Sequence, residues 1–212
     1  MKLNLKQFKS TEQYKNDIAK RLLTDTPCHV PHLYSDTEES IIFYCDTDAE
    51  MLTLLRRALK DVNITQQHLS DEYLLGVIEA MRPRVTFISD FLNNSPYFFN
   101  PPSVYDNDVV KKRWNEDTPQ QMKVLIEEFD KLEIPQKADY ESALRRAAEK
   151  LNVNSGLPVK DMASNLIHAV RLALTGVGGG PGLYDIIYLL GKTESIRRIE
   201  AAVKTINPAH QI

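Results

Sequence analysis

The chain has 212 residues, of which 42% are hydrophobic and 26% are charged, and its formal net charge is −3. These values are typical of a globular protein with one or two compact units, and they exclude a disordered or fibrous chain. No run approaches the roughly 18 consecutive apolar residues of a membrane span, and the start lacks the apolar core of a secretory signal. We therefore expect a cytoplasmic protein.

The charge is unevenly distributed along the chain. A net negative charge argues against indiscriminate binding of nucleic acid through a large positive field. Residues 141–206, however, carry nine Lys and Arg against six Asp and Glu, whereas the remainder carries 17 against 23. A polyanion is therefore expected to prefer the C-terminal third. The two cysteines, Cys28 and Cys45, are expected to be reduced thiols.

The N-terminal half is predicted to be largely helical, because apolar residues recur at three- and four-residue spacing. Capping boxes predict helices that begin near Thr11 and Asp48, and Ser70 precedes a helix that should end before Pro83. Residues 28–45 contain prolines and a short apolar run, which leaves a loop with a short strand and a bent helix both open.

Helix signals are clearer in the C-terminal half. Thr118 and Pro119 predict a cap and a first helical residue, and residues 138–152 are rich in strong helix formers. The next predicted helix ends at Gly176 and carries one apolar stripe, formed by Met162, Leu166, Ala169, Val170 and Ala173. Beyond it, we expect Pro181 to open a short helix that Gly191 closes, followed by a last helix from about Glu194 to Ile206.

The proline- and aromatic-rich segment around residues 95–114 predicts a junction near Lys112. This divides the chain into two subdomains, residues 1–112 and 113–212. Trp114 is expected to anchor the junction, although stacking on a nucleic-acid base is an alternative.

No motif supports catalysis. The run His29-Val30-Pro31-His32 has a proline where the nucleotide signature H-x-G-H needs glycine, and the signature K-M-S-K is absent. Cys28, His29 and His32 lack a fourth ligand for zinc, and the glycine run departs from the dinucleotide fingerprint at Pro181. We therefore expect no catalytic residue, no metal site and no cofactor in this chain.

Two further groups of polar residues are interpreted as structural. Glu127, Glu128 and Asp130, flanked by lysines, are expected to form a solvated helix face. His168, on an otherwise apolar stretch, is expected to be a packed histidine.

The most informative pattern runs from Leu166 to Ile199. Its elements occur at fixed offsets, at Arg171, Leu174, Thr175, Gly176, Pro181, Leu183, Leu190, Gly191, Lys192, Arg198 and Ile199. This run resembles the C-terminal anticodon-binding domain of bacterial glutamyl-tRNA synthetases. A weaker match, Glu79 to Phe99, is similar to the helical subdomain of that family and contains Arg84.

The resemblance implies an all-α helical bundle or cage of two subdomains, of the anticodon-binding type found in class I aminoacyl-tRNA synthetases. It implies a monomer that binds the anticodon stem-loop of glutamate tRNA, and neither DNA nor a membrane. The parent protein would be a glutamate-tRNA ligase, with ATP and Mg²⁺ in an N-terminal catalytic domain that this chain lacks. The residues expected at the anticodon are Arg171, Thr175, Gly178, Gly179, Gly180, Pro181, Gly182, Leu183 and Arg84. Those expected at the tRNA backbone are Lys192, Arg197 and Arg198.

The chemistry of these residues fits RNA binding. Arg171 offers a planar fork of donors, and glycines at 178–180 let a base approach the backbone. A helix that begins at Pro181 would present free N–H groups to a phosphate. Alternatively, Arg171 pairs with Asp185 or caps its own helix, and the glycines form a plain corner between helices. A helical protein-interaction module that keeps this fold is the alternative function.

Overall fold

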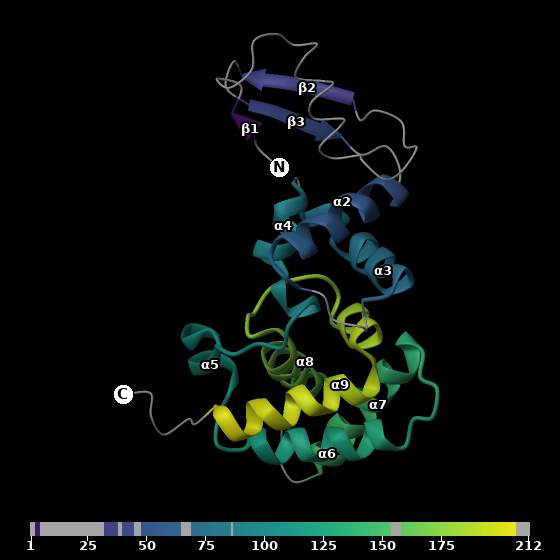
Figure 1. Ribbon diagram of the computed structural model, residues 1–212. Coiled ribbons are helices and arrows are strands. Elements are labelled where there is room, and N and C mark those ends of the chain that lie inside the picture. The colour runs from purple at the N-terminus through teal and green to yellow at the C-terminus, as the bar shows by residue number, and fades with distance from the viewer. Residues whose placement is uncertain are drawn as a thin grey trace. The chain divides into compact units, whose positions relative to one another are not determined.

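The computed structural model describes residues 3–4, 32–37, 40–44, 48–64, 69–85, 87–153 and 158–206. The chain divides into two compact units, Met1–Asn94 and Ser95–Ile212. Figure 1 shows strands and helices in the described part of the first unit and helices in that of the second. The helix predicted from Thr11 and residues 28–31 lie outside the described residues.

Three short strands form an antiparallel sheet in the first unit. They are β1 (Leu3–Asn4), β2 (His32–Thr37) and β3 (Ser40–Tyr44), in the order β1-β3-β2. In β2 and β3, His32 is paired with Tyr44, and the register is irregular between Ser35 and Thr37. The run of β3 is rich in β-branched and aromatic residues, which favour strands. This part of the chain therefore departs from the predicted all-α class.

The helices of the first unit are α2 (Asp48–Asp61), α3 (Asp71–Met81), η2 (Arg82–Arg84) and α4 (Ile88–Asn94). As predicted, α2 begins at Asp48, and the Ser70 side chain caps α3 by accepting the Tyr73 N–H at 3.1 Å. Helix α2 packs on both α3 and α4. Their shared core consists of Leu55, Leu59, Leu69, Leu74, Val77, Ile78, Met81 and Phe91.

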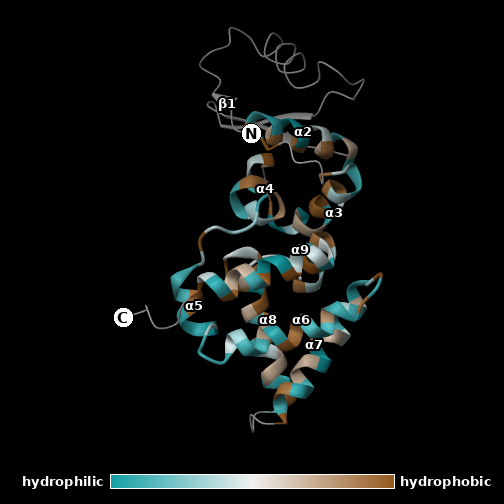
Figure 2. Cartoon of the chain, turned by 60° about the horizontal axis from the view of Figure 1, so that its bottom comes forward, coloured by the Kyte–Doolittle hydropathy of each residue, from teal (hydrophilic) through white to brown (hydrophobic). Residues whose placement is uncertain are grey.

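The described residues of the second unit form four long helices and two shorter elements. In chain order they are η3 (Pro96–Phe98), α5 (Asn107–Arg113), α6 (Thr118–Asp130), α7 (Lys137–Asn152), α8 (Val159–Thr175) and α9 (Leu183–Thr205). Each of the four long helices contacts the other three, and α5 packs on α8. The predicted apolar stripe of α8 is buried, and Figure 2 shows apolar and polar residues alternating along these helices as amphipathic helices require. The all-α prediction is confirmed for the described part of residues 48–206.

Three helix ends differ from the prediction. Helix α6 begins at Thr118 with Asp117 as its N-cap, one residue earlier than expected. Helix α9 begins at Leu183 with Gly182 as its N-cap, so Pro181 precedes the helix instead of opening it. The predicted break at Gly191 is present, because this residue has φ 77° and ψ 166° within the span of α9.

The junction near Lys112 also differs from the structure, which divides the chain between Asn94 and Ser95. Tyr97, Phe98 and Phe99 are buried, and the Tyr97 carbonyl accepts a hydrogen bond from Arg198 of α9. The aromatic segment thus belongs to the core of the second unit. None of the helices in the described ranges is long and apolar enough to span a bilayer.

A buried carboxylate joins α6 to α7. Glu128 is only 1% exposed and pairs with Lys131, with Arg146 at 2.8 Å and with Lys150 at 2.6 Å. Burial alone would raise the pKa of Glu128, but hydrogen bonds from these three cations outweigh burial and lower the pKa to about 2. We call these four residues the Glu128 cluster. The prediction that Glu128 lies on a solvated face is wrong, because its side chain faces α7.

Candidate functional site

The connection between α8 and α9 begins at Gly176, a position that only glycine fits. Gly176 has φ 78°, in the left-handed region, and its N–H donates to the Leu172 carbonyl at 2.8 Å. A Cβ at this position would lie 2.5 Å from the Val104 backbone oxygen. Glycine tolerates both the left-handed conformation and the close approach, so α8 ends here.

Thr175 shapes the turn from inside. Its side chain hydroxyl donates to the Arg171 carbonyl at 2.7 Å and accepts the Val177 N–H at 3.2 Å, and the residue is only 5% exposed. Pro181 and Leu183 are buried as well. Packing and hydrogen bonds occupy these three side chains inside the unit, so only their backbone groups are available for the expected contact with RNA.

Gly178, Gly179 and Gly180 are exposed and differ in the space around them. A Cβ at Gly178 would lie 2.9 Å from a Val109 methyl group, whereas a Cβ at Gly179 would meet nothing within 4 Å. Gly180 has φ 137°, and a Cβ there would lie 2.8 Å from the Tyr97 hydroxyl. The chain surface is thus bare of side chains and is open at Gly179.

The Arg171 side chain crosses to this turn from α8. Its Nη1 donates to the Pro181 carbonyl at 2.7 Å and lies 3.5 Å from the position of a Cβ on Gly180. Arg171 is half-buried, and the hydrogen bond to Pro181 holds its guanidinium beside the glycines. We call Arg171 together with Gly178–Gly180 the turn site.

Gly182 and Asp185 lie at the start of α9. A Cβ on Gly182 would meet the Asp185 carboxylate, so the Asp185 side chain would have to move to admit another residue there. Asp185 forms an ion pair with Lys137 of α7, at 2.5 Å between Nζ and Oδ1. Asp185 therefore links α9 to α7.

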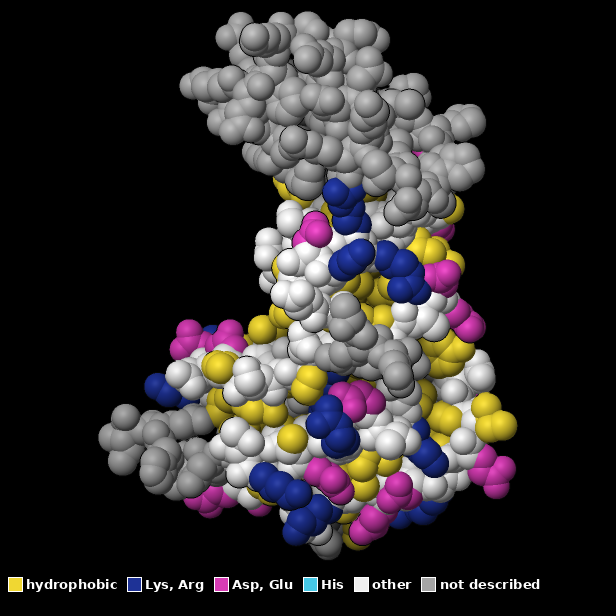
Figure 3. Space-filling view, viewed as in Figure 1, with side chains coloured by type: hydrophobic (Ala, Val, Ile, Leu, Met, Phe, Trp, Pro, Cys, Tyr) yellow, Lys and Arg dark blue, Asp and Glu magenta, His cyan; other side chains and the backbone are white. Residues whose placement is uncertain are grey.

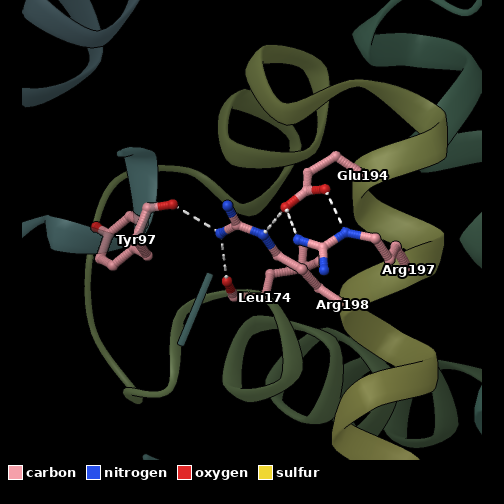
Figure 4. Close-up of polar contacts among 5 residues, drawn as sticks. All are labelled: Tyr97, Leu174, Glu194, Arg197 and Arg198. Carbon is pink, nitrogen blue, oxygen red and sulfur yellow. Dashed lines mark hydrogen bonds and ion pairs between the residues drawn. The ribbon is translucent and has the colours of Figure 1, made fainter. Parts of the chain in front are cut away.

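Arg198 connects three segments of the second unit, as Figure 4 shows. Its Nη1 donates to the Tyr97 carbonyl at 2.6 Å and to the Leu174 carbonyl at 3.0 Å, and its Nε donates to Glu194 at 2.6 Å. The side chain is 4% exposed. We call Arg198 and these partners the Arg198 tie. The prediction that Arg198 contacts the tRNA backbone is wrong, because a buried guanidinium cannot reach a phosphate.

The other two cations expected at the tRNA backbone also have protein partners. Arg197 forms a bidentate ion pair with Glu194, in which Nε and Nη2 each donate to a carboxylate oxygen at 2.7 Å. The Arg197 side chain is 55% exposed. These hydrogen bonds raise the pKa of Arg197. Lys192 donates to the Leu132 carbonyl at 2.5 Å, which joins α9 to the segment after α6.

Arg84 lies in the first unit, whereas the residues of the turn site belong to the second. It is the exposed last residue of η2. Asp90, in the helix that follows, accepts the Phe87 N–H at 2.8 Å.

Three cations outside the residues expected at the RNA lie at the end of α5, which packs on α8. Lys111, Lys112 and Arg113 end α5 and are exposed. His168 of α8 is half-buried, and burial, followed by the nearby positive charges of Arg113 and Arg171, lowers its pKa. Trp114 is only 3% exposed, which supports an anchoring role and leaves no face for a stacked base. Figure 3 shows Lys and Arg interspersed with Asp and Glu on the visible face, without one large basic field.

The chemistry of this region suits binding. Among the described residues, no group of three or more His, Cys, Asp or Glu side chains could hold a metal ion. The turn site instead combines a bare backbone with a fixed guanidinium plane. Proteins that read single-stranded RNA use such planes to stack splayed bases and use polar groups to contact base edges.

Comparison with known proteins identifies the family. Residues 49–203 match the sequence profile described as "Anticodon binding domain". The chain belongs to this family of anticodon-binding domains. The match covers α2 to α9, including the turn site.

Relatives of this anticodon-binding domain include much longer proteins. It is 38% identical over 141 residues to the glutamate-tRNA ligase of Chloroherpeton thalassium, covering 65% of this chain and 26% of that protein. It is 33% identical over 160 residues to that of Parabacteroides distasonis, covering 76% of this chain and 30% of that protein. The chain thus spans between a quarter and a third of the length of these relatives.

Solved structures show the same arrangement of helices. A glutamate tRNA ligase from Elizabethkingia meningosepticum, in complex with its amino acid, superposes with a TM-score of 0.65 at 29% identity, covering 76% of this chain and 30% of that one. The glutamate-tRNA synthetase from Elizabethkingia anophelis, at 22% identity, shares the fold with a TM-score of 0.62 over 93% of this chain and 32% of that one. The resemblance to glutamyl-tRNA synthetases found in the sequence is therefore confirmed.

Proposed function

We propose that this chain binds the anticodon loop of glutamate tRNA and distinguishes it from other anticodons through the turn site. The observation that carries the proposal is the exposed backbone at Gly178–Gly180 beside the fixed guanidinium of Arg171. Membership of the anticodon-binding family and the names of the relatives support it. The names of the relatives support specificity for glutamate tRNA, and the geometry of the turn site supports reading of the anticodon.

The turn site can read a base in two ways. A base splayed from the loop would stack on the Arg171 guanidinium plane, and its edge would meet the backbone groups of the glycine turn. Gly179 leaves room for this approach, because no atom lies within 4 Å of the position that a Cβ would occupy there. The hydrogen bond from Arg171 to Pro181 holds the guanidinium before RNA arrives, which reduces the side-chain entropy lost on binding.

In a complete ligase, this module would hold the tRNA while a catalytic domain attaches glutamate with ATP. ATP and Mg²⁺ would then act in the catalytic domain, and the module itself would contribute affinity and anticodon selection. Among the residues predicted from sequence, this proposal keeps Arg171 and the four exposed glycines at positions 178–180 and 182. Arg84 remains a candidate for a neighbouring nucleotide because it is exposed.

The test is fluorescence anisotropy with a labelled glutamate-tRNA anticodon stem-loop. Its affinity for the full chain is compared with that of the same hairpin carrying another anticodon, at low and at high salt. We expect tighter binding of the glutamate anticodon, weakened by salt because phosphate contacts release counterions. Equal and negligible binding of both hairpins, repeated with full-length tRNA, would contradict the proposal. Capture of a discrete protein without RNA would then favour the protein-interaction module.

A further inference from the structure

We propose that the basic last turn of α5 and His168 of α8 form a phosphate-binding strip that grips the RNA backbone beside the turn site. The strip consists of Lys111, Lys112, Arg113 and His168. This inference rests on the proposed function and extends it, since the strip would supply affinity that does not depend on the anticodon sequence.

The first step is that α5 is fixed directly beside the turn. The N–H of Asp106, the N-cap of α5, donates to the Gly176 carbonyl at 2.8 Å. The Val109 side chain lies 2.9 Å from the position of a Cβ on Gly178. The start of α5 therefore touches both ends of the segment that leads into the glycines.

The second step is that the basic end of α5 lies close to this contact. A helix rises about 1.5 Å per residue, so the last turn of α5 lies on the order of 10 Å from its N-cap. Val110 and Trp114 are each 3% exposed, and the Trp114 N–H donates to the Val110 carbonyl at 2.9 Å. These buried residues hold the end of α5 in place. An RNA hairpin is wide enough to contact the turn site and this end together.

The third step is that the three cations of α5, Lys111, Lys112 and Arg113, form no ion pair with a carboxylate in the part of the chain that the structure describes. Asp108, the one acidic residue of α5, lies in its first turn. Basic residues at the end of a helix are favourable for the helix itself. The Glu128 cluster differs from the strip, because its cations pair with a carboxylate. The cations of α5 remain exposed to solvent.

The fourth step is that His168 connects the strip to the turn site. His168 and Arg171 are three residues apart on α8, and α5, which ends at Arg113, packs on α8. After burial, the positive charges of Arg113 and Arg171 also lower the pKa of His168. Ser164 and Asn165, one turn earlier on α8, are exposed and polar. A neutral imidazole offers one donor and one acceptor, so this face suits the phosphates and 2′-hydroxyl groups of RNA.

The start of α9 is a weaker candidate for phosphate than the strip. Helix N-termini attract anions, but Asp185 already places a carboxylate in the first turn of α9. A phosphate there would lie beside that negative charge. The strip offers three exposed cations, and the acidic residue of α5 lies at the opposite end of that helix.

The experiment compares two triple variants of the full chain with the same change in net charge. The strip variant is K111Q/K112Q/R113Q. The control variant is K123Q/R145Q/K204Q, which removes exposed cations from α6, α7 and α9. Both hairpins of the previous test are titrated over a range of salt, and thermal unfolding verifies that each variant folds. The double variant K111Q/K112Q replaces the strip variant if the latter unfolds.

We expect the strip variant to bind both hairpins roughly tenfold more weakly at low salt, with the same ratio between anticodons. Its plot of log affinity against log salt should be shallower by about 2, since each lost phosphate contact on single-stranded RNA reduces the slope by roughly 0.7. The control should stay within about twofold of the wild type. Equal losses in both variants, or no loss in the strip variant, would overturn the strip. Failure of the proposed function would appear separately, as a wild-type chain that does not distinguish the hairpins.

Discussion

Two regions of the second unit use arginine in opposite ways. In the Arg198 tie, a guanidinium that is 4% exposed bonds two backbone carbonyls and Glu194. In the turn site, Arg171 bonds the Pro181 carbonyl at 2.7 Å and remains half-buried beside exposed glycines. Both residues belong to the same sequence pattern, but only one lies at the surface. The pattern thus combines residues that hold the fold with residues available to a ligand.

The difference can be tested by separating stability from binding. Removing the Arg198 tie should destabilise the unit, because it leaves buried carbonyls and a half-buried carboxylate without their donor. Changing the turn site should leave the fold nearly intact and should alter RNA recognition. The following predictions run from the largest expected effect to the smallest.

Arg198→Ala is expected to have the largest effect on stability. It leaves the Tyr97 and Leu174 carbonyls and Glu194 without their shared donor, at a cost of about 3–4 kcal/mol in the free energy of unfolding. Urea unfolding followed by circular dichroism measures this loss. Arg197→Ala is the matched control, because its side chain is 55% exposed, and it should cost less than about 1 kcal/mol. Equal costs for the two variants would contradict a structural role for Arg198.

Glu128→Gln tests the Glu128 cluster, whose contribution to the free energy of unfolding depends on pH. The pKa of Glu128 is held at about 2, below the ordinary 4.5, so its ionised form stabilises the fold at neutral pH. This contribution is present above about pH 4.5 and is lost as pH falls toward 2. Its three partners are about half exposed, and solvent screening limits the expected cost at neutral pH to about 2 kcal/mol.

The measurement for Glu128 is urea unfolding of wild type and variant at neutral pH and near pH 3. The difference between the two proteins should shrink at the lower pH, because Glu128 is protonated there in the unfolded wild-type chain but stays mostly ionised in the folded protein, so that unfolding takes up a proton. A constant difference across this range would show that the charge of Glu128 does not stabilise the fold.

The glycines of the turn provide an internal contrast. Gly180→Ala should cost about 2 kcal/mol, because φ 137° strains any other residue and the new Cβ would lie 2.8 Å from the Tyr97 hydroxyl. Gly179→Ala should change the free energy of unfolding by no more than about 0.5 kcal/mol, or raise it slightly, since its Cβ meets no neighbour within 4 Å. Thermal unfolding separates the two. A marked loss for Gly179→Ala would show that the open space has a structural role.

Arg171→Ala is expected to have the smallest effect on stability among the disruptive changes. The variant loses the hydrogen bond to the Pro181 carbonyl, which is worth about 1 kcal/mol. Urea unfolding should therefore show a protein that folds and retains most of its stability. A loss as large as that of Arg198→Ala would place Arg171 with the structural residues.

Local sequence signals predicted much of the helical architecture. Ser70 and Pro83 bounded α3, and the spacing of apolar residues in α8 matched its buried face. Gly176 and Gly191 marked breaks that the structure contains, because a left-handed backbone conformation favours glycine. These features depend on neighbouring residues, so sequence was sufficient to find them.

Features that depend on tertiary partners were not predicted. The run 95–99 was interpreted as a junction, but its aromatic rings are buried in the second unit, where Arg198 of α9 holds the Tyr97 carbonyl. Glu128 was interpreted as solvated because its partners Arg146 and Lys150 lie on another helix. The strands at residues 32–44 were left open because a short apolar run fits either a strand or a helix.

The candidate site was predicted in part for the same reason. The resemblance located the turn, but it could not separate side chains that face outward from those that face the core. Thr175, Leu183 and Arg198 are 5%, 4% and 4% exposed, so they support the site from within. Lys111, Lys112 and Arg113 lie outside the matched pattern, and only the packing of α5 on α8 brings the helix that carries them to the helix that carries Arg171.

The central claim is that Arg171 and its glycine turn read the anticodon. It is tested most directly by the affinity ratio between the glutamate hairpin and the hairpin with another anticodon, measured for the wild type, Arg171→Ala and Arg171→Lys. The account predicts that both folded variants lose roughly tenfold to a hundredfold of this ratio, because lysine lacks the planar fork of arginine. An Arg171→Ala protein that folds and keeps the full wild-type ratio would contradict it.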